Sequence, residues 1–305
     1  MMQLRSRFAP SPTGLLHVGN AYSALLCAHW AVSNGAELLL RIEDIDHGRC
    51  RPQFIDSIYE DLQWLGLSWP EPVRLQSSHL EDYCTAIARL RELDLIYPCF
   101  CTRKSIQQEI AKMAIAPHAE DAASIYPGIC RDLSSVEQTR RMQSTPSAWR
   151  LNVQKAMKLI ASPLCWHDEQ GRKHSADIDH DVVIGRKDIS FSYHLSVVVD
   201  DAIQGITHII RGKDLESSTA IHRLLQQLLG LPEPTYIHHP LIYTSAGERL
   251  AKRNGATTLA SLREIGVDAQ KLSAYLLNLP ELIWPFEQQT RSTYSSEILR
   301  LLGKR

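Results

Sequence analysis

Apolar and polar positions follow two different spacings along this chain, and the spacings predict where its helices and strands lie. Over residues 52–67 and 79–95, apolar side chains recur at helical spacing with acidic side chains on the other face. This pattern predicts two helices that each pack one face against a core. Residues 258–265 and 271–279 predict two more short helices. Together with the strands described next, these helices indicate an α/β fold.

Short apolar runs that end in charged side chains predict buried parallel strands. Residues 37–44 form one such run and residues 207–214 form another. Residues 191–201 join a helix start to a β-branched run, which predicts a third strand. Residues 148–185 alternate short polar and apolar pieces, as a small connecting β-region does. The sequence therefore predicts several strands whose charged ends converge.

Three acids follow the strand over residues 37–44. Open α/β sheets bind ligands at the carboxyl ends of their strands, so Glu43, Asp44 and Asp46 lie where a substrate is expected. A solvated loop or a helix N-cap is the alternative for these acids, and Asp44 and Asp46 suit a cap well.

The first chemical signal is the loop over residues 7–20. Pro10 and Pro12 exclude helix, Gly14 permits a turn, and helix-forming residues begin at Asn20, which predicts a strand, a turn and a helix. Such a loop presents the N–H groups of a helix N-terminus to a polyanion. Gly19 leaves room for a nucleotide and His17 could donate to a phosphate oxygen. Taken alone, the segment could equally be an ordinary strand–helix connection.

A second signal is a group of cysteines. Cys99 and Cys101 are separated by one residue, and Cys130 follows after an insert of mostly helix-forming residues. Three thiolates grouped in this way suggest a tetrahedral zinc site that needs a fourth ligand. His118 is the chemical first choice, because imidazole is a commoner zinc ligand than phenol. Three buried free cysteines are the alternative.

Composition narrows the class of protein. The chain is 44% hydrophobic and 22% charged, which is typical of a globular protein that can bury a core. Its 33 basic and 34 acidic side chains give a formal net charge of -1, so any surface for nucleic acid must be local. Seven cysteines, an odd number, argue against a disulfide framework. The sequence has no apolar leader and no membrane-spanning run, so we expect a cytoplasmic protein. We also expect a monomer.

Four segments, in this order, resemble the signatures of class I aminoacyl-tRNA synthetases of the glutamyl type. Residues 7–20 resemble the HIGH signature in its glutamyl form, and residues 41–46 resemble RIEDTD. Residues 191–214 are similar to the family's TYHLAxVVDD and HVIRGxDL. The basic, glycine-flanked loop over residues 247–255 resembles KMSKS in its KLSKR form. The resemblance covers almost the whole chain.

The resemblance implies which side chains bind each substrate. The residues implied to bind glutamate are Arg7, Ala9, Ser11, Glu43, Tyr193 and Arg211. The residues implied to bind ATP with Mg²⁺ are Pro10, His17, Gly19, Asn20, Arg249 and Lys252, of which His17 and Lys252 are implied to be catalytic.

Within these sets, Glu43 would contact the α-amino group of glutamate, and Arg211 and Tyr193 would face its side-chain carboxylate. A guanidinium pairs bidentately with a carboxylate but is left unpaired by an amide, so Arg211 favours glutamate over glutamine. A surface salt bridge is the alternative for Arg211. Lys252 would stabilise charge as pyrophosphate leaves.

The chain departs from the family pattern at three positions. Val197 stands where the family commonly has an asparagine, so a polar contact from that position is lost. Arg249 and Ala251 replace the first lysine and the serine of the second signature. For the metal, the resemblance implies that a structural zinc is held by Cys99, Cys101, Tyr126 and Cys130, which leaves Tyr126 and His118 as rival fourth ligands.

The implied fold is a Rossmann-like class I catalytic domain, a parallel sheet with helices on both faces, interrupted by a connective insertion. We expect the first half of the catalytic domain over residues 1–95 and the insertion with the zinc site over 96–185. The second half would then occupy 186–257, and a short helical region 258–305.

The residues after Lys252 are too few to form the helical domain with which glutamyl-type synthetases read the anticodon. The resemblance is best to family members without that domain. Those enzymes activate glutamate with ATP and attach it to queuosine at the wobble position of tRNA(Asp). The alternatives are a truncated synthetase that charges tRNA(Glu) and a paralogue that binds tRNA or glutamate without catalysis.

Overall fold

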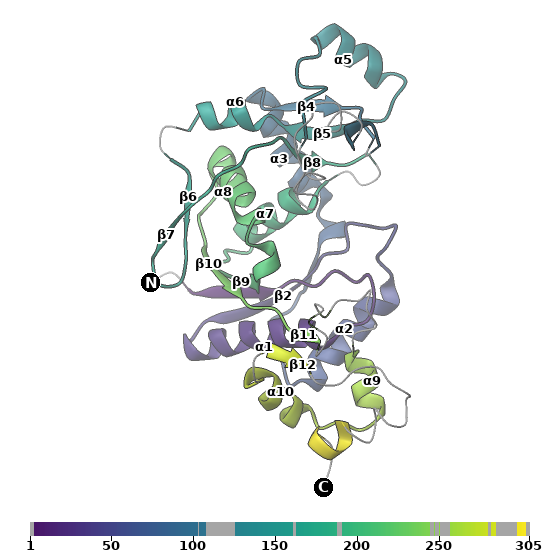
Figure 1. The fold of residues 1–305 in the computed structure, drawn as a ribbon, viewed down its shortest axis with the longest axis vertical. Coiled ribbons are helices and arrows are strands. Elements are labelled where there is room, and N and C mark those ends of the chain that lie inside the picture. Colours follow the sequence, from purple (N-terminus) through teal and green to yellow (C-terminus); the bar gives the residue numbers. More distant parts are fainter. Residues whose placement is uncertain are drawn as a thin grey trace. The chain divides into compact units, whose positions relative to one another are not determined.

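The computed structural model describes residues 3–102, 104–107, 126–160, 163–187, 191–244, 247, 250, 257–279, 282–284 and 298–302. The chain forms two compact units (Figure 1). Unit 1 comprises Met1–Ser78, Gly205–Glu216 and Pro234–Arg305, and unit 2 comprises His79–Gln204 and Ser217–Glu233. Each unit is described by itself below.

Unit 1 is built on parallel strands. Two groups of strands in its main sheet pair in parallel, in the orders β3-β2-β1 and β10-β9. The groups adjoin, because the backbone N–H of Thr207 donates to the carbonyl of Arg5 over 3.0 Å. The strands therefore follow the order β3-β2-β1-β9-β10, a doubly wound arrangement. Their bounds are β1 Arg5–Phe8, β2 Glu37–Ile42, β3 Arg74–Leu75, β9 His208–Gly212 and β10 Thr235–His239.

Helices pack against the sheet of unit 1, and the apolar side chains between them form a core. The buried core side chains include Ile42 of β2, Leu62 and Trp284, each no more than 1% exposed. Cys27 packs inside as well, with its Sγ 3.7 Å from the carbonyl oxygens of both Arg7 and Ile210, so it contacts two neighbouring strands at once. The remaining elements are α1 Val18–Ser33, α2 Pro52–Trp64, η1 Gln76–Ser78, η2 Lys213–Leu215, β11 Tyr243–Thr244, α9 Leu259–Glu264, α10 Ala269–Leu277 and β12 Ile283–Trp284.

Unit 2 combines helices with a small antiparallel sheet. The sheet has the order β4-β5-β8, and β6 and β7 form a separate hairpin. The helices α3, α7 and α8 pack on one another. The elements are α3 Leu80–Glu92, β4 Ile96–Cys99, α5 Ser135–Met142, β5 Ala148–Leu151, α6 Val153–Lys158, β6 Cys165–His167, β7 Lys173–Ser175, β8 Val182–Gly185, α7 Tyr193–Ile203 and α8 Ser218–Leu229.

Most of the predicted elements are confirmed, with ends that differ by a few residues. The helices predicted over 52–67 and 79–95 are α2 and α3, and the strand predicted over 37–44 is β2. None of the helices in the described ranges is both long and apolar enough to cross a membrane.

The strand predicted for the β-branched run near residue 197 is wrong. These residues lie in α7, which Ser192 caps by accepting the backbone N–H of Leu195. Val197, Val198 and Val199 are all buried. Burial of three adjacent valines on a helix therefore outweighs their preference for strands.

A buried acid joins α2 to α9. Asp61 is 0% exposed, and its carboxylate lies 3.1 Å from the Arg263 guanidinium. Burial raises the pKa of Asp61 from 3.8 to about 6, although Arg263 acts in the opposite direction. Because the folded-state pKa lies above the unfolded one, the stability that this group contributes is full below about pH 4 and is lost as the pH rises through 6.

We therefore expect Asp61→Asn, which cannot titrate, to gain stability relative to the wild type between pH 4 and pH 7. The difference in free energy of unfolding should grow by up to about 3 kcal/mol over this range. Urea unfolding at a series of pH values measures it. Asp56→Asn, an exposed acid on the same helix, is the matched control. Parallel pH profiles for Asp61→Asn and the wild type would contradict the prediction.

Candidate active site and metal cluster

Several predicted site residues lie at one edge of the unit 1 sheet. Strands β1, β2, β9 and β10 run parallel, so their carboxyl ends share this edge. Ala9 and Pro10 follow β1, and Glu43 follows β2. The backbone N–H of Glu43 donates to the Pro10 carbonyl over 3.0 Å, which joins the first two sequence signatures directly. Pro10 is buried, while Ser11 in the same loop is exposed.

His17 is the N-cap of α1. Its Nδ1 accepts the Gly19 N–H over 3.1 Å, and the Asn20 side-chain oxygen accepts the His17 N–H over 3.1 Å, so the two side chains form a capping box. Because Nδ1 accepts this bond, the proton of the neutral imidazole lies on Nε2. The Nε2–H is therefore the ring group that can donate to a phosphate oxygen at the helix N-terminus.

The missing side chain of Gly19 leaves the space that the His17 ring occupies. A Cβ at position 19 would lie 3.0 Å from Cε1 and 3.1 Å from Nδ1 of His17, so the ring would have to move. We expect Gly19→Ala to cost about 1 kcal/mol of stability through the lost cap. We also expect it to lower the rate of ATP–pyrophosphate exchange about 10- to 100-fold.

Thermal unfolding and the exchange assay measure these two effects. Ser33→Ala, at the exposed far end of the same helix, is the control. An exchange rate equal to that of the wild type would separate Gly19 from the nucleotide.

The three acids after β2 differ in their surroundings. Glu43 is 7% exposed, and its carboxylate lies 3.3 Å from the fully buried Arg41 guanidinium. Asp44 instead accepts both the N–H and the hydroxyl of Ser77, over 2.8 and 2.6 Å. Asp46 pairs with the exposed Arg49. Asp44 therefore holds the distant turn at Ser77, and Glu43 is the acid best placed to meet a substrate at the strand end.

Arg211 lies on β9 and is 4% exposed, so it is no surface salt bridge. Its Nε–H donates to Nε2 of His238 over 3.3 Å, and its guanidinium carbon lies 5.3 Å from the centre of the Tyr236 ring. Both neighbours come from β10, whose register pairs His238 with Arg211. With Nε engaged, a bidentate contact between Arg211 and a carboxylate uses the two terminal nitrogens. Arg7 of β1 is likewise buried.

Of the other residues that the sequence analysis singled out, the structure describes some and not others. Tyr193 is the first residue of α7 in unit 2, and its ring packs edge-on against His194 and His222, with centroids 5.6 Å apart in each case. Val197 is 1% exposed, so apolar packing fills the position of the family's asparagine. Arg249 and Lys252 lie outside the described residues, as does His118.

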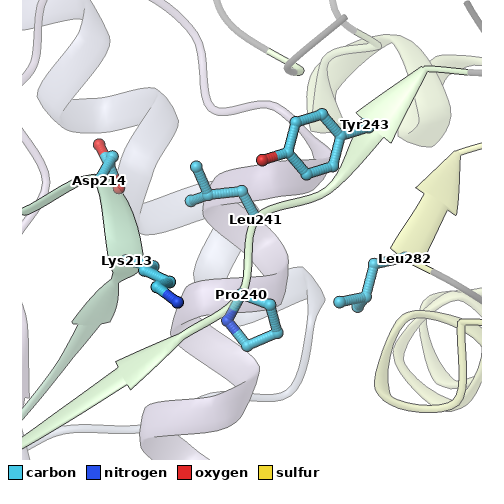
Figure 2. Close-up of a pocket in the computed structure, with 6 residues that line it drawn as sticks. All are labelled: Lys213, Asp214, Pro240, Leu241, Tyr243 and Leu282. Atoms are coloured by element: carbon cyan, nitrogen blue, oxygen red, sulfur yellow. The ribbon is translucent and has the colours of Figure 1, made fainter. Parts of the chain in front are cut away.

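A cavity of about 350 Å³ opens beside the ends of β9 and β10 in unit 1. Figure 2 shows Lys213 and Asp214 on one side of it and Tyr243 and Leu282 on the other, with Leu241 and Pro240 between. A Cβ at Gly212 would crowd Asp214 Oδ1 and lie 2.9 Å from Leu241 Cδ2, so the ends of both side chains would have to shift. The cavity thus combines apolar walls with one cation and one anion.

The three cysteines predicted to bind a metal lie close together in unit 2. The Sγ atoms of Cys99, Cys101 and Cys130 lie within 4.8 Å of one another, and the cluster could hold a metal ion. The Tyr126 hydroxyl lies 3.5 Å from Cys99 Sγ and 3.8 Å from Cys101 Sγ. A tetrahedral zinc with about 2.3 Å bonds to sulfur has ligand–ligand edges of about 3.8 Å, which is close to these two distances.

The chemistry of these atoms suits a cation. Hydrogen bonds from Cys130 and Tyr126 lower the pKa of Cys99 in spite of its burial, which favours the thiolate form of this sulfur. A thiolate is the form of cysteine that binds metal.

Comparison with known proteins decides the family. Residues 3–291 match the family described as tRNA synthetases class I (E and Q), catalytic domain. The chain belongs to this class I synthetase family. The resemblance and the α/β fold with a parallel sheet are therefore confirmed.

Two relatives of this class I synthetase are named glutamyl-Q tRNA(Asp) synthetase. The one from Rhodobacter capsulatus is 42% identical over 272 residues, which cover 86% of this chain and 95% of the relative. The one from Deinococcus radiodurans is 41% identical over 303 residues, which cover 99% of this chain and 97% of the relative.

Glutamate–tRNA ligases are matched over a smaller share of their length. The one from Prochlorococcus marinus strain MIT 9303 is 36% identical over 286 residues, which cover 90% of this synthetase but 58% of the relative. A crystal structure of a glutamate tRNA ligase from Elizabethkingia meningosepticum, in complex with its amino acid, has a TM-score of 0.71 and 25% identity. The match covers 99% of this chain and 66% of the ligase.

Sequence reasoning missed several neighbours of the predicted site residues in this synthetase. Tyr236 and His238 flank Arg211. Their alternation along β10 was the available signal, because alternate side chains of a strand share a face. Arg41 was noticed only as part of a signature, although its burial beside Glu43 makes it the natural partner of that acid.

Proposed function

We propose that this class I synthetase activates L-glutamate with Mg-ATP and transfers the glutamyl group to queuosine at the wobble position of tRNA(Asp). The observation that carries the proposal is its likeness to the relatives with that name. They are 38–44% identical, and in the Deinococcus case the match extends over nearly the full length of both chains. The buried Arg211, which suits a carboxylate, supports glutamate as the amino acid.

In the first step, the chain's own residues hold glutamate at the carboxyl edge of the unit 1 sheet. Glu43 would receive the α-ammonium group, as a carboxylate facing a cation does. Arg211 would receive the side-chain carboxylate, with Arg7 adding a second buried cation. The loop residues Ala9 and Ser11 would contact the amino acid through the backbone of the loop. The family resemblance adds Tyr193 as a further glutamate contact.

ATP would lie along the same edge. Its phosphates suit the N-terminus of α1, where the His17 Nε2–H donates and Pro10, Gly19 and Asn20 shape the loop. The cavity beside β9 and β10 is suited to the nucleoside, because its walls are apolar and Lys213 and Asp214 can bind polar edges. Arg249 and Lys252 would hold the departing phosphates, and Mg²⁺ offsets their charge.

The reaction then needs no covalent enzyme intermediate. The α-carboxylate of glutamate attacks the α-phosphorus, the bond to the bridging oxygen breaks, and pyrophosphate leaves glutamyl-adenylate behind. A hydroxyl of the cyclopentene ring of queuosine next attacks the activated carbonyl, and AMP leaves. Positioning and electrostatic stabilisation supply most of the rate. We propose that the reaction takes place in the cytoplasm and that a monomer performs it.

The cysteine cluster would hold one structural zinc, with Tyr126 as fourth ligand in place of His118. The hydroxyl of Tyr126 already lies at one corner of the group, and the backbone N–H of Cys130 donates to it over 2.9 Å. Zinc would fix the end of β4 against the segment around Cys130.

Charging of tRNA(Glu) is the second candidate, since glutamate–tRNA ligases match at 36% identity. The higher identity and fuller coverage of the relatives named glutamyl-Q tRNA(Asp) synthetase favour the queuosine reaction.

ATP–pyrophosphate exchange tests the amino-acid step. We expect exchange with glutamate, and an at least about 100-fold lower kcat/KM with glutamine, because the amide leaves Arg211 unpaired. Equal exchange with both amino acids would contradict the assignment of glutamate. An absence of exchange with either would favour a binding protein without catalysis.

A further inference from the structure

Arg150 stacks on a proposed metal ligand. It lies on β5, is 9% exposed, and holds its guanidinium carbon 3.7 Å from the centre of the Tyr126 ring. Its Nε is buried and finds no hydrogen-bond partner within the described ranges. A buried cation in this state is costly unless nearby negative charge compensates it.

A single carboxylate holds this arrangement together. Asp181 is 1% exposed and accepts the Tyr97 hydroxyl over 2.5 Å, Arg131 Nε over 2.7 Å and the Val153 N–H over 2.9 Å. Its backbone carbonyl accepts Nη1 of Arg150 over 3.0 Å.

Two of the partners of Asp181 come from the segments that carry the cluster. Tyr97 lies two residues before Cys99 on β4, and Arg131 follows Cys130 directly. Asp181 therefore ties the two halves of the cysteine cluster to Arg150.

The charge of the cluster explains why a cation is needed there. Three thiolates alone exceed the charge of a divalent cation, and an ionised Tyr126 would add to the excess. Two of the three sulfurs and the phenol are buried, so water screens this excess poorly. A guanidinium over the phenol ring is the arrangement that a cation–π contact favours.

We propose that Arg150, fixed by Asp181, is the buried counter-charge of the cysteine cluster and strengthens its affinity for zinc. The inference rests on the proposed metal site and is independent of the amino acid and the tRNA. Partners outside the direct ligands of a metal commonly change its affinity 10- to 100-fold, roughly the effect expected here.

Competition with a chromophoric zinc chelator, on the full chain, measures this affinity. Arg150→Met removes the charge at similar length, Arg150→Lys keeps the charge without the planar group, and Arg140→Met removes an exposed arginine of α5 as the control. We expect Arg150→Met to bind zinc about 10- to 100-fold more weakly. Arg150→Lys should recover most of the loss, and Arg140→Met should match the wild type.

A second readout separates counter-charge from folding. Thermal unfolding of the metal-free proteins reports any purely structural effect of Arg150. If Arg150→Met lowers the midpoint of the metal-free chain but leaves zinc affinity unchanged, the inference is overturned while the metal site stands. If the wild type binds no zinc, the inference about Arg150 and the proposed zinc site are both overturned. The proposed glutamate reaction is unaffected by this result. Should Arg150→Met not fold, Arg150→Gln decides in the same way.

Discussion

Arg211→Met lowers kcat/KM for glutamate in ATP–pyrophosphate exchange by about 100- to 1,000-fold, because a buried carboxylate then loses its charge-assisted partner. The loss falls on the amino acid alone, so KM for ATP stays within about twofold of the wild type. Discrimination against glutamine also falls, since methionine no longer distinguishes a carboxylate from an amide. Exchange kinetics with each amino acid and with ATP measure all three quantities.

Arg5→Met is the matched control for this prediction. Arg5 lies at the amino end of β1, opposite the site edge, where it pairs with Glu37 at 2.7 Å and is 36% exposed. An exposed pair of this kind contributes at most about 1 kcal/mol to stability, so its loss should leave the kinetics unchanged. If Arg211→Met kept the wild-type KM and kcat for glutamate, Arg211 would not face the substrate.

Lys252→Ala is expected to lower kcat for exchange by about 100- to 1,000-fold while glutamate still binds. An ammonium in this glycine-flanked basic segment of the sequence would stabilise the charge that develops as pyrophosphate leaves, and alanine supplies no replacement. Pre-steady-state formation of glutamyl-adenylate measures the chemical step directly.

Lys271→Ala, on the exposed face of α10, is the control for the loss of one lysine near this loop in the sequence. Undiminished exchange in Lys252→Ala would remove this lysine from the mechanism. A raised KM for glutamate with kcat unchanged would assign it to binding instead.

Local pattern was sufficient for part of the fold. The helices α2 and α3 show one apolar face each, and α2 also begins with Pro52 at its first position, so period and start agree. Pattern failed at Val197–Val199, because strand preference is weak against the burial of a whole helix. It could not reveal the pairing of β9 with β10 either, since register between distant segments depends on tertiary packing.

As with the fold, the sequence predicted only part of the candidate site. The signatures indicated Glu43 and Arg211, and the structure places both, buried, at or beside one sheet edge. Cysteine spacing indicated a thiolate cluster, but only the fold brings the Tyr126 hydroxyl against Cys99 and Cys101. Asp44 lies in the same signature as Glu43, yet its hydrogen bonds to Ser77 give it a structural role that no local pattern encodes.

The most direct test of the proposed function is transfer of labelled glutamate to tRNA. The purified chain would be incubated with Mg-ATP, labelled glutamate and tRNA from two sources, one able to make queuosine and one not. We predict label on tRNA(Asp) from the first source and none on any tRNA from the second. Label on tRNA(Glu) from both sources would contradict the account and make the protein a charging enzyme.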